Sequence, residues 1–272
     1  MILNLGEDSM PLAHSQLVAL TGKIFTGTLP TARLLTSLLL FGLLIGCSAK
    51  GAPAPSQAQP AAASAPPAQP ANVGDAKLRA TAYHDSGDYG RDLAAVAHEA
   101  DLWIAQRAAK VARPALVLDI DETSLSNWPV IKANDYGYVI PGPCTNLPEG
   151  PCGWQAWDLL GRDVALDATL KTFQQAKANK VTVFFITGRP ESQRLATERN
   201  LREAGYGGYE RLYMTPDGAH YQSAADYKAP VRKRIEDDGY TIIANMGDQP
   251  SDLAGGHAEK VFLLPDPFYR IP

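Results

Sequence analysis

The chain lacks a strong excess of charge of either sign. Among its 272 residues, 25 Lys and Arg stand against 29 Asp and Glu, so the formal net charge is −4. This mild balance argues against nucleic-acid binding through a basic surface. The length suits one ordinary domain with additional segments, or two small domains.

Long hydrophobic runs are also missing, apart from residues 34–46, LLTSLLLFGLLIG. This run is too short for a comfortable transmembrane helix and has the size of the apolar region of a signal peptide. It ends beside Cys47, and the letters LIGC resemble the bacterial lipobox, in which the cysteine is lipidated and becomes the mature N-terminus. We therefore predict a signal peptide over 1–46 and lipidation of Cys47. The alternatives are an ordinary secretory signal with a chance cysteine, or an uncleaved anchor.

Charge and apolar periodicity are both nearly absent from Gly51 to about Ala71, where Ala, Pro, Ser and Gln dominate. Such a composition cannot bury a core, so we predict that 47–76 forms the lipidated cysteine and a flexible tether. A lipid anchor followed by a tether holds a soluble domain at a membrane without spanning it. We expect a lipid-anchored protein of the cell envelope, periplasmic or on the outer membrane, with its folded domain over 77–272.

Cysteine is scarce, with three residues in all, and two of them lie in PGPCTNLPEGPCGW as Cys144 and Cys152. Export to an oxidising compartment favours a disulfide between them. The Pro and Gly residues of the segment allow the loop to close. Two free thiols are the alternative, and a zinc site lacks nearby histidine partners.

The remaining sequence alternates between helical and strand-like patterns. Apolar residues at helical spacing predict helices over 91–111, 167–180 with Asp167 as N-cap, Pro190 to Gly205, and 226–239. Short stretches rich in apolar, aromatic and β-branched residues predict strands over 115–120, 181–186, 209–214, 240–248 and 259–267. Together they indicate an α/β fold with a parallel sheet covered by helices on both faces.

Polar residues follow the predicted strands, where parallel sheets bind their ligands. These residues are Asp119, Asp121, Thr187, Gly188, Arg189, Asp248 and Asp252, and Lys228 lies on the helix before the fourth strand. Clustered carboxylates at a buried strand end are costly without a cation, and a hard divalent ion, most simply Mg²⁺, removes that cost. A metal, a lysine and a hydroxyl together can bind a phosphoryl group, which an aspartate can attack.

Four segments resemble, in order, the motifs of the haloacid dehalogenase (HAD) superfamily: DIDET, ITGR, YKAPVRKR and NMGDQPSD. The stretches LVLDIDETSLSN, GDQPSDL and VFLLPDPFYRIP resemble its acid phosphatase branch, subfamily IIIB, which includes bacterial class C acid phosphatases and plant vegetative storage proteins. The resemblance spans about 78–272. It implies a HAD-type Rossmann-like sheet and a Mg²⁺-dependent acid phosphatase. The RHGxRxP pattern of histidine-type acid phosphatases is absent, so no phosphohistidine route is indicated.

The resemblance assigns catalytic and metal-binding roles to four aspartates. Asp119 would attack phosphorus, and Asp121 would protonate the leaving alcohol and then activate water. Mg²⁺ would be bound by Asp119, by the backbone carbonyl of Asp121 and by Asp248. Asp252 would ligate through water or support the site; its alternative is an acid at a helix N-terminus.

The resemblance also assigns the phosphoryl oxygens to Thr187, Gly188 and Lys228. Alternatively, Thr187 is a turn residue without a role in binding, and the side chain of Lys228 is solvated. Arg189 is open to contact with substrate, but an arginine in the first turn of a helix usually faces water. The basic run 232–234 is expected to form the exposed face of its helix.

Residues 124–163 lie where HAD enzymes place the cap that selects the substrate. They are rich in aromatic residues: Trp128, Tyr136, Tyr138, Trp154 and Trp157. These rings either stack on a nucleoside base or phenyl ring, or simply pack the cap. The segment around the two cysteines is not part of the family pattern.

The function predicted from the sequence is therefore hydrolysis of small phosphomonoesters, nucleotides or aromatic phosphates among them, through an aspartyl-phosphate. One alternative is a non-enzymatic relative, because some plant storage proteins of this branch have lost the nucleophile; here Asp119 is present. Another is a glycosyltransferase using the DID triplet for a nucleotide-sugar metal, which leaves ITGR, Lys228 and GDQPSD unexplained.

Overall fold

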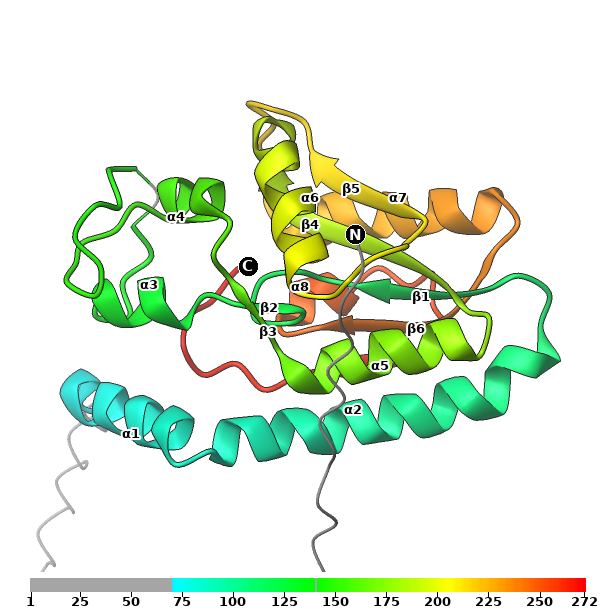
Figure 1. Ribbon diagram of the computed structural model, residues 1–272, viewed down its shortest axis with the longest axis horizontal. Helices are drawn as coiled ribbons and strands as arrows, with labels where there is room; N and C mark the ends of the chain where they lie inside the picture. Colours follow the sequence, from blue (N-terminus) through cyan, green and yellow to red (C-terminus); the bar gives the residue numbers. More distant parts are fainter. Residues whose placement is uncertain (1–69, 140) are drawn as a thin grey trace, which may run out of the picture. The chain divides into compact units, whose positions relative to one another are not determined.

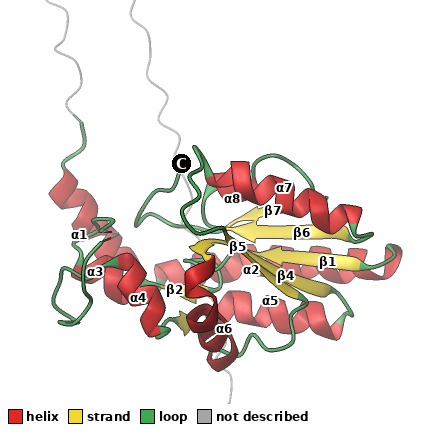
Figure 2. Cartoon of the chain, turned by 90° about the horizontal axis from the view of Figure 1, so that it is seen from above, coloured by secondary structure: helices red, strands yellow, loops and turns green. Residues whose placement is uncertain are grey.

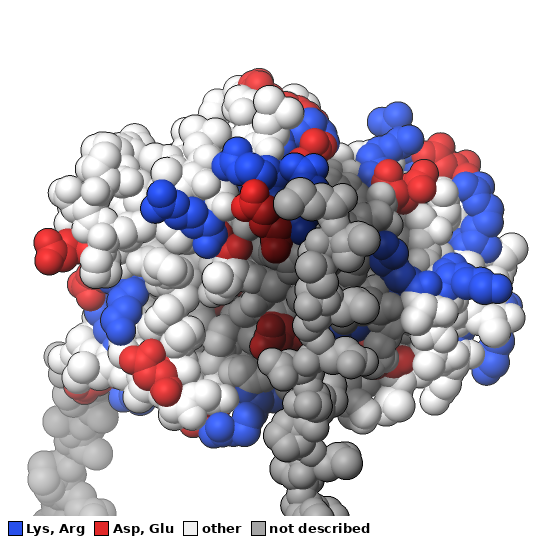
Figure 3. Space-filling model, in the orientation of Figure 1, with Lys and Arg blue, Asp and Glu red and all other residues white. Residues whose placement is uncertain are grey.

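The computed structural model describes residues 70–139 and 141–272 (Figure 1). The predicted signal peptide over 1–46, the lipidation site Cys47 and the tether up to residue 69 lie outside these residues. Among the helices of the described part, none combines the length and the apolar character that crossing a membrane requires. On the face drawn in Figure 3, the described Lys and Arg side chains are interspersed with Asp and Glu.

Five parallel strands form the central sheet and confirm the predicted α/β fold. They are β1 (Pro114–Leu118), β4 (Thr182–Pro190), β5 (Arg211–Thr215), β6 (Thr241–Gly247) and β7 (Val261–Leu263). Their order is β5-β4-β1-β6-β7, so the first strand of the chain lies at the centre of the sheet. Leu116 of β1 is in register with Val183 of β4 on one side and with Ala244 of β6 on the other.

Helices cover both faces of this sheet (Figure 2). On one face, α2 (Asp88–Arg107), α5 (Asp167–Ala178) and α6 (Arg194–Glu203) contribute to a large apolar cluster that includes Leu116 and Leu118. On the other, α7 (Ala224–Asp237) packs on a smaller cluster that includes Ala115 and Val117. Successive residues of β1 therefore enter opposite cores, which is why its sequence is apolar throughout.

Two helix starts differ from the prediction. Leu166, not Asp167, is the N-cap of α5, and Asp167 is its first helical residue. Strand β4 continues through Pro190 and is followed by the short helix η2 (Glu191–Gln193), so α6 begins only at Arg194. The extension of β4 matters for the site, because it turns Arg189 from a helix-start residue into a strand residue.

Helix α1 (Val73–Asp85) begins inside the range 47–76 that was predicted as tether. Asn72 caps it by accepting a hydrogen bond from the backbone N–H of Asp75 at 3.1 Å. No residue of α1 is buried, so the helix leaves no apolar stripe in the sequence. Helix α2 follows and ends in the short helix η1 (Ala108–Lys110).

The predicted cap lies between β1 and β4. It contains α3 (Trp128–Ala133) and α4 (Trp154–Leu160), flanked by β2 (Leu125–Ser126) and β3 (Val164–Ala165), which pair in antiparallel fashion. The structure contains the predicted disulfide between Cys144 and Cys152. Asn134 holds the second cysteine, since its amide accepts from the Cys152 N–H at 2.7 Å and donates to the Cys152 carbonyl at 2.9 Å.

Candidate active site

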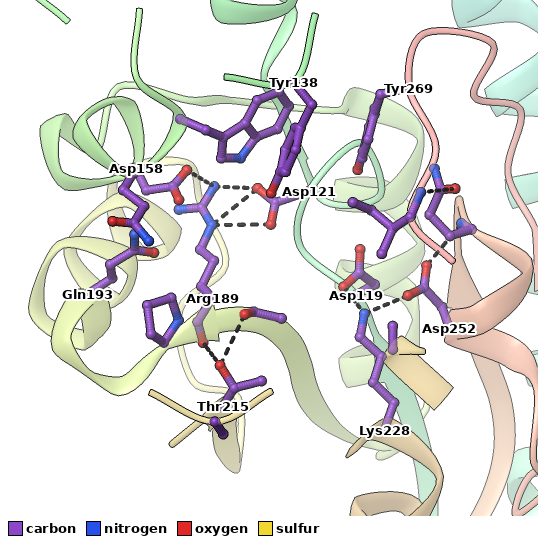
Figure 4. A pocket seen from close by; sticks show the side chains of 18 of the residues that line it. Asp119, Asp121, Tyr138, Asp158, Arg189, Gln193, Thr215, Lys228, Asp252 and Tyr269 are labelled. Atoms are coloured by element: carbon purple, nitrogen blue, oxygen red, sulfur yellow. Dashed lines mark hydrogen bonds and ion pairs between the residues drawn. The ribbon is translucent and has the colours of Figure 1, made fainter. Parts of the chain in front are cut away.

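A cavity of about 490 Å³ lies at the carboxyl ends of the central strands (Figure 4). Seven of the eight residues singled out in the sequence line it: Asp119, Asp121, Gly188, Arg189, Lys228, Asp248 and Asp252. Residues from the cap and from the C-terminal segment complete its wall, among them Tyr138, Trp154, Asp158 and Tyr269. The cavity therefore lies at the edge where parallel sheets usually bind their ligands.

A tight turn after β1 places the first two aspartates. The backbone N–H of Asp119 donates to the carbonyl of Met246 at 3.0 Å, which ties the end of β1 to β6. The carbonyl of Asp119 accepts from the Ser124 hydroxyl at 2.6 Å. Glu122 adopts a φ of 51°, a conformation that is uncommon outside glycine and reverses the chain here. The two carboxylates of Asp119 and Asp121 are thereby directed to different parts of the cavity.

Lys228 is buried between two carboxylates on one side of the cavity. Its ammonium donates to Asp119 and, at 2.6 Å, to Oδ1 of Asp252. Burial alone would lower the pKa of Lys228, but the two carboxylates raise it above its usual value. The lysine therefore stays charged beside Asp119, and the alternative of a solvated lysine is wrong because its side chain is only 5% exposed.

Asp119, Asp248 and Asp252 form a compact carboxylate cluster. One oxygen from each lies within 4.8 Å of the others. Burial raises the pKa of Asp119 to about 7, with the opposing attraction of Lys228 and the repulsion of Asp252 as smaller effects. Burial followed by the neighbouring carboxylates raises the pKa of Asp248 well above its usual range. Three buried oxygen donors with one lysine fit a hard divalent cation, which would favour their ionised forms.

Hydrogen bonds orient Asp248 from both sides. The hydroxyl of Thr123 donates to its Oδ1 at 3.0 Å, and the amide of Gln249 donates to its Oδ2 at 2.6 Å. The same Gln249 amide also donates to Asp266 at 2.7 Å. Gln249 therefore links this predicted metal ligand to the C-terminal segment, a contact that sequence motifs did not reveal.

Asp121 lies apart from this cluster and pairs with Arg189 (Figure 4). The guanidinium donates to Asp121 at 2.6 Å through Nη2 and at 3.1 Å through Nε. Nη2 also lies 3.1 Å from Asp163 and 3.5 Å from Asp158. Burial acts to raise the pKa of Asp121, but Arg189, Asn127 and Lys228 together outweigh burial, so the pKa is lowered.

The expectation that Arg189 faces water is wrong, because its side chain is 2% exposed. It lies in β4 and meets carboxylates that come from the cap. Asp158 and Asp163 were missed in the sequence because nothing local marks them: their common partner lies tens of residues further along the chain. Asp158 and Asp163 can be recognised as partners of Arg189 only in the folded structure, where the cap brings them to the guanidinium.

Thr187 and Gly188, the predicted phosphate ligands of β4, occupy different positions. Gly188 lines the cavity. Thr187 lies within β4, is fully buried and is not among the lining residues. Its hydroxyl accepts from the backbone N–H of Arg189 at 3.1 Å, which holds the end of the strand.

Arg232 corrects the prediction for the basic run 232–234. Lys233 and Arg234 are exposed, as expected, but Arg232 is fully buried. Its guanidinium donates to the carbonyls of Asp252 at 2.6 Å and Gly256 at 2.9 Å, and also to Ala254. It therefore fixes the backbone that follows α8 (Pro250–Leu253), the short helix that carries Asp252.

Of the five cap aromatics, Tyr138 and Trp154 line the cavity. The rings of Tyr138 and Tyr269 are nearly parallel, with an interplanar angle of 9° and 6.3 Å between centroids. Trp154 packs against Tyr138 at 4.7 Å. Trp128, Tyr136 and Trp157 do not line the cavity, so these three rings pack the cap. Tyr138 and Trp154, by contrast, can reach a bound molecule.

A central parallel sheet with a DxD pair after its first strand, a lysine before its fourth and two further aspartates after that strand defines a HAD-type site. The family model of the HAD superfamily, subfamily IIIB (acid phosphatase), matches residues 52–272. The chain belongs to this family, which leaves the glycosyltransferase alternative without support.

Individual relatives agree with this assignment. The chain is 32% identical to Acid phosphatase 1 of Solanum lycopersicum over 58% of its own length and 60% of the relative. It is 35% identical to the Stem 28 kDa glycoprotein of Glycine max, over 58% of its own length and 61% of that protein. The chain thus spans less than two thirds of these curated relatives. The solved class C acid phosphatase from Bacillus anthracis has a similar fold, with a TM-score of 0.58 and 21% identity over 73% of this chain and 86% of that one.

Proposed function

We propose that this protein is a Mg²⁺-dependent acid phosphatase that hydrolyses small phosphomonoesters. One observation carries the proposal: Asp119 lies against Lys228 in a cavity that also holds Asp248 and Asp252. A nucleophilic carboxylate, a fixed cation for phosphoryl oxygens and donors for a divalent metal are thus combined in one place. Membership in the acid phosphatase subfamily supports it.

In the first step, a carboxylate oxygen of Asp119 forms a bond to phosphorus. The bond between phosphorus and the ester oxygen breaks, and the departing oxygen keeps the electron pair and takes a proton from Asp121. Lys228 and the backbone of Gly188 are placed to bind phosphoryl oxygens, since both line the cavity. The product of this step is an aspartyl-phosphate and a free alcohol.

In the second step, Asp121 accepts a proton from water as the water oxygen bonds to phosphorus. The bond between phosphorus and Asp119 breaks, which releases inorganic phosphate and restores the carboxylate. The two aspartates lie on different sides of the cavity, where Asp119 is paired with Lys228 and Asp121 with Arg189. Acid–base help of this kind contributes about 10²- to 10⁴-fold.

The metal would be held by Asp119, Asp248 and the backbone carbonyl of Asp121, with Asp252 ligating directly or through water. Oxygen donors of this kind suit Mg²⁺. When bound, the ion neutralises charge on the phosphoryl group and on the clustered carboxylates.

For the substrate, we favour phosphate esters with an aromatic or nucleoside group. Tyr138 and Tyr269 present nearly parallel rings at the wall of the cavity, and Trp154 extends this apolar surface. Aromatic rings gain binding free energy by stacking on other rings. For location, we propose the cell envelope, with a lipid anchor at Cys47; the letters LIGC and the nearly uncharged, Ala- and Pro-rich tether that follows support this.

The test is hydrolysis of p-nitrophenyl phosphate by the purified protein, with added Mg²⁺ and after treatment with EDTA. The proposal expects turnover that EDTA abolishes and Mg²⁺ restores. A protein that folds but hydrolyses nothing in either state would support the storage-like alternative. Turnover that persists after complete metal removal would contradict the metal dependence.

A further inference from the structure

Asp121 is held by a chain of hydrogen bonds that starts in the cap. The indole N–H of Trp157, on α4, donates to Oδ1 of Asn127 at 2.8 Å. The amide nitrogen of Asn127 then donates to Oδ1 of Asp121 at 2.9 Å. Trp157 is 3% exposed and Asn127 is fully buried.

The indole fixes which way the amide of Asn127 faces. An indole N–H can only donate, so the amide oxygen must lie toward Trp157. The amide nitrogen, with its two protons, is thereby turned toward carboxylates. One proton goes to Asp121 and the other to Oε2 of Glu122 at 2.9 Å. Both amide protons and the amide oxygen of Asn127 therefore have partners, which fixes the orientation of the amide.

The same turn of α4 is also connected to Asp121 through Arg189. Asp158, the residue after Trp157, lies 3.5 Å from Arg189, and Arg189 donates to Asp121. Adjacent residues of one cap helix therefore act on both partners of this carboxylate. The start of α4 is itself fastened, because Asn134 binds both backbone groups of Cys152, two residues before the helix.

We propose that Trp157 and Asn127 are positioning residues that set the carboxylate of Asp121 for proton transfer to the leaving group. Neither lines the cavity, so they act through Asp121 and not on the substrate. The inference rests on the proposed function, since it gives the cap a role in the chemical step in addition to any role in binding.

The test is Trp157→Phe, which keeps an aromatic ring and removes the N–H. The quantity to measure is kcat/KM for p-nitrophenyl phosphate and for glycerol 3-phosphate. This constant covers the steps up to departure of the alcohol, so hydrolysis of the intermediate does not enter it. An alkyl leaving group needs the proton far more than a nitrophenol does. We expect the aryl-to-alkyl ratio of kcat/KM to rise about tenfold, part of the general-acid contribution.

The matched control is Trp128→Phe, on the neighbouring helix α3. The Trp128 ring stacks on His84 with 3.7 Å between centroids, and its N–H donates to none of the described residues. Its ratio should stay within twofold of wild type. If Trp157→Phe does not fold, as judged by circular dichroism, benzothienylalanine at position 157 decides, because it keeps the fused rings and has sulfur in place of the N–H.

A uniform loss on both esters, or no loss on either, would overturn the positioning role, because only the acid step distinguishes the two leaving groups. The proposed function fails separately, and this inference with it, if the wild-type protein hydrolyses neither ester in the presence of Mg²⁺. A wild type that is active, with an unchanged ratio in the folded variant, overturns the inference alone.

Discussion

Arg232 provides the sharpest quantitative test of the structure. Among residues 70–139 and 141–272 it is the largest fully buried side chain, and its guanidinium donates to three backbone carbonyls around the end of α8. Replacing it by methionine keeps most of the apolar length and removes all of these donors. The variant Arg232→Met should therefore destabilise the fold and loosen the segment that carries Asp252.

The magnitude follows from what each carbonyl retains. A hydrogen bond to a charged group contributes about 1.5–3 kcal/mol, so three of them give at most about 9 kcal/mol. The carbonyl of Asp252 keeps a second donor, the amide of Asn245 at 3.1 Å. Ala254 and Gly256 are exposed residues, so water can replace the guanidinium there. Removing a buried charge also recovers part of its desolvation cost. We expect a net loss of about 3 kcal/mol.

The assays are urea unfolding and thermal unfolding of wild type and variant, both followed by tryptophan fluorescence with the disulfide intact. For a protein of this size, a loss of about 3 kcal/mol corresponds to a fall in Tm of roughly 6–12 °C. Arg234→Met is the matched control, because Arg234 is exposed on the same helix. It should change stability by less than about 0.5 kcal/mol. Equal, small effects of both substitutions would refute the assignment of Arg232 as a buried clamp.

Four further outcomes are expected. Asp119→Asn should abolish hydrolysis of p-nitrophenyl phosphate with the circular dichroism spectrum unchanged; near-wild-type kcat would reject Asp119 as nucleophile. Asp121→Asn should lower kcat/KM more for glycerol 3-phosphate than for p-nitrophenyl phosphate, and equal losses would count against its role as acid. Burial, with Arg189 opposing, raises the pKa of Asp163 to about 6, above the unfolded value of about 3.9, so the contribution of this carboxyl to stability is fully present below about pH 4 and is lost as pH rises through about 6. Asp163→Asn should remove this contribution, so that the unfolding free energy falls less between about pH 4 and pH 7; an unchanged slope would exclude this carboxyl as a source of the pH dependence. Cys47→Ser should move phosphatase activity from the membrane to the soluble fraction at unchanged specific activity, whereas wild-type activity that is wholly soluble would reject the lipid anchor.

The sheet could be predicted because its strands carry their own signal. Runs such as 181–186 consist of apolar or β-branched residues at every position, which is typical of a strand buried on both faces. Helix α1 could not be predicted in the same way, because no residue of it is buried and its sequence has no reason to alternate. Hydrophobic periodicity in a sequence reflects the burial of one face of a helix, so an exposed helix does not show it.

The site could be predicted as far as its residues follow strand ends. Asp119, Asp248 and Lys228 were found by their position relative to apolar runs and by the motif resemblance. Arg189 and Arg232 were misplaced because whether an arginine is buried depends on acceptors elsewhere in the chain. Arg189 meets Asp121 across 68 positions, and Arg232 meets carbonyls 20 to 24 positions away. Such distant partners cannot be inferred from the residues that neighbour each arginine in the sequence.

The central position of β1 has a consequence for how the protein folds. Leu116 of β1 pairs with Val183 of β4 and with Ala244 of β6, so both neighbouring strands are far from β1 in the sequence. Pairings over such separations form slowly, because a long loop must close before the contacts stabilise it. The edge pairs β4–β5 and β6–β7 bring together strands that follow one another in the chain. Recovery of hydrolysis during refolding will therefore trail behind the first appearance of secondary structure, since Asp119 meets its partners only when the middle of the sheet closes.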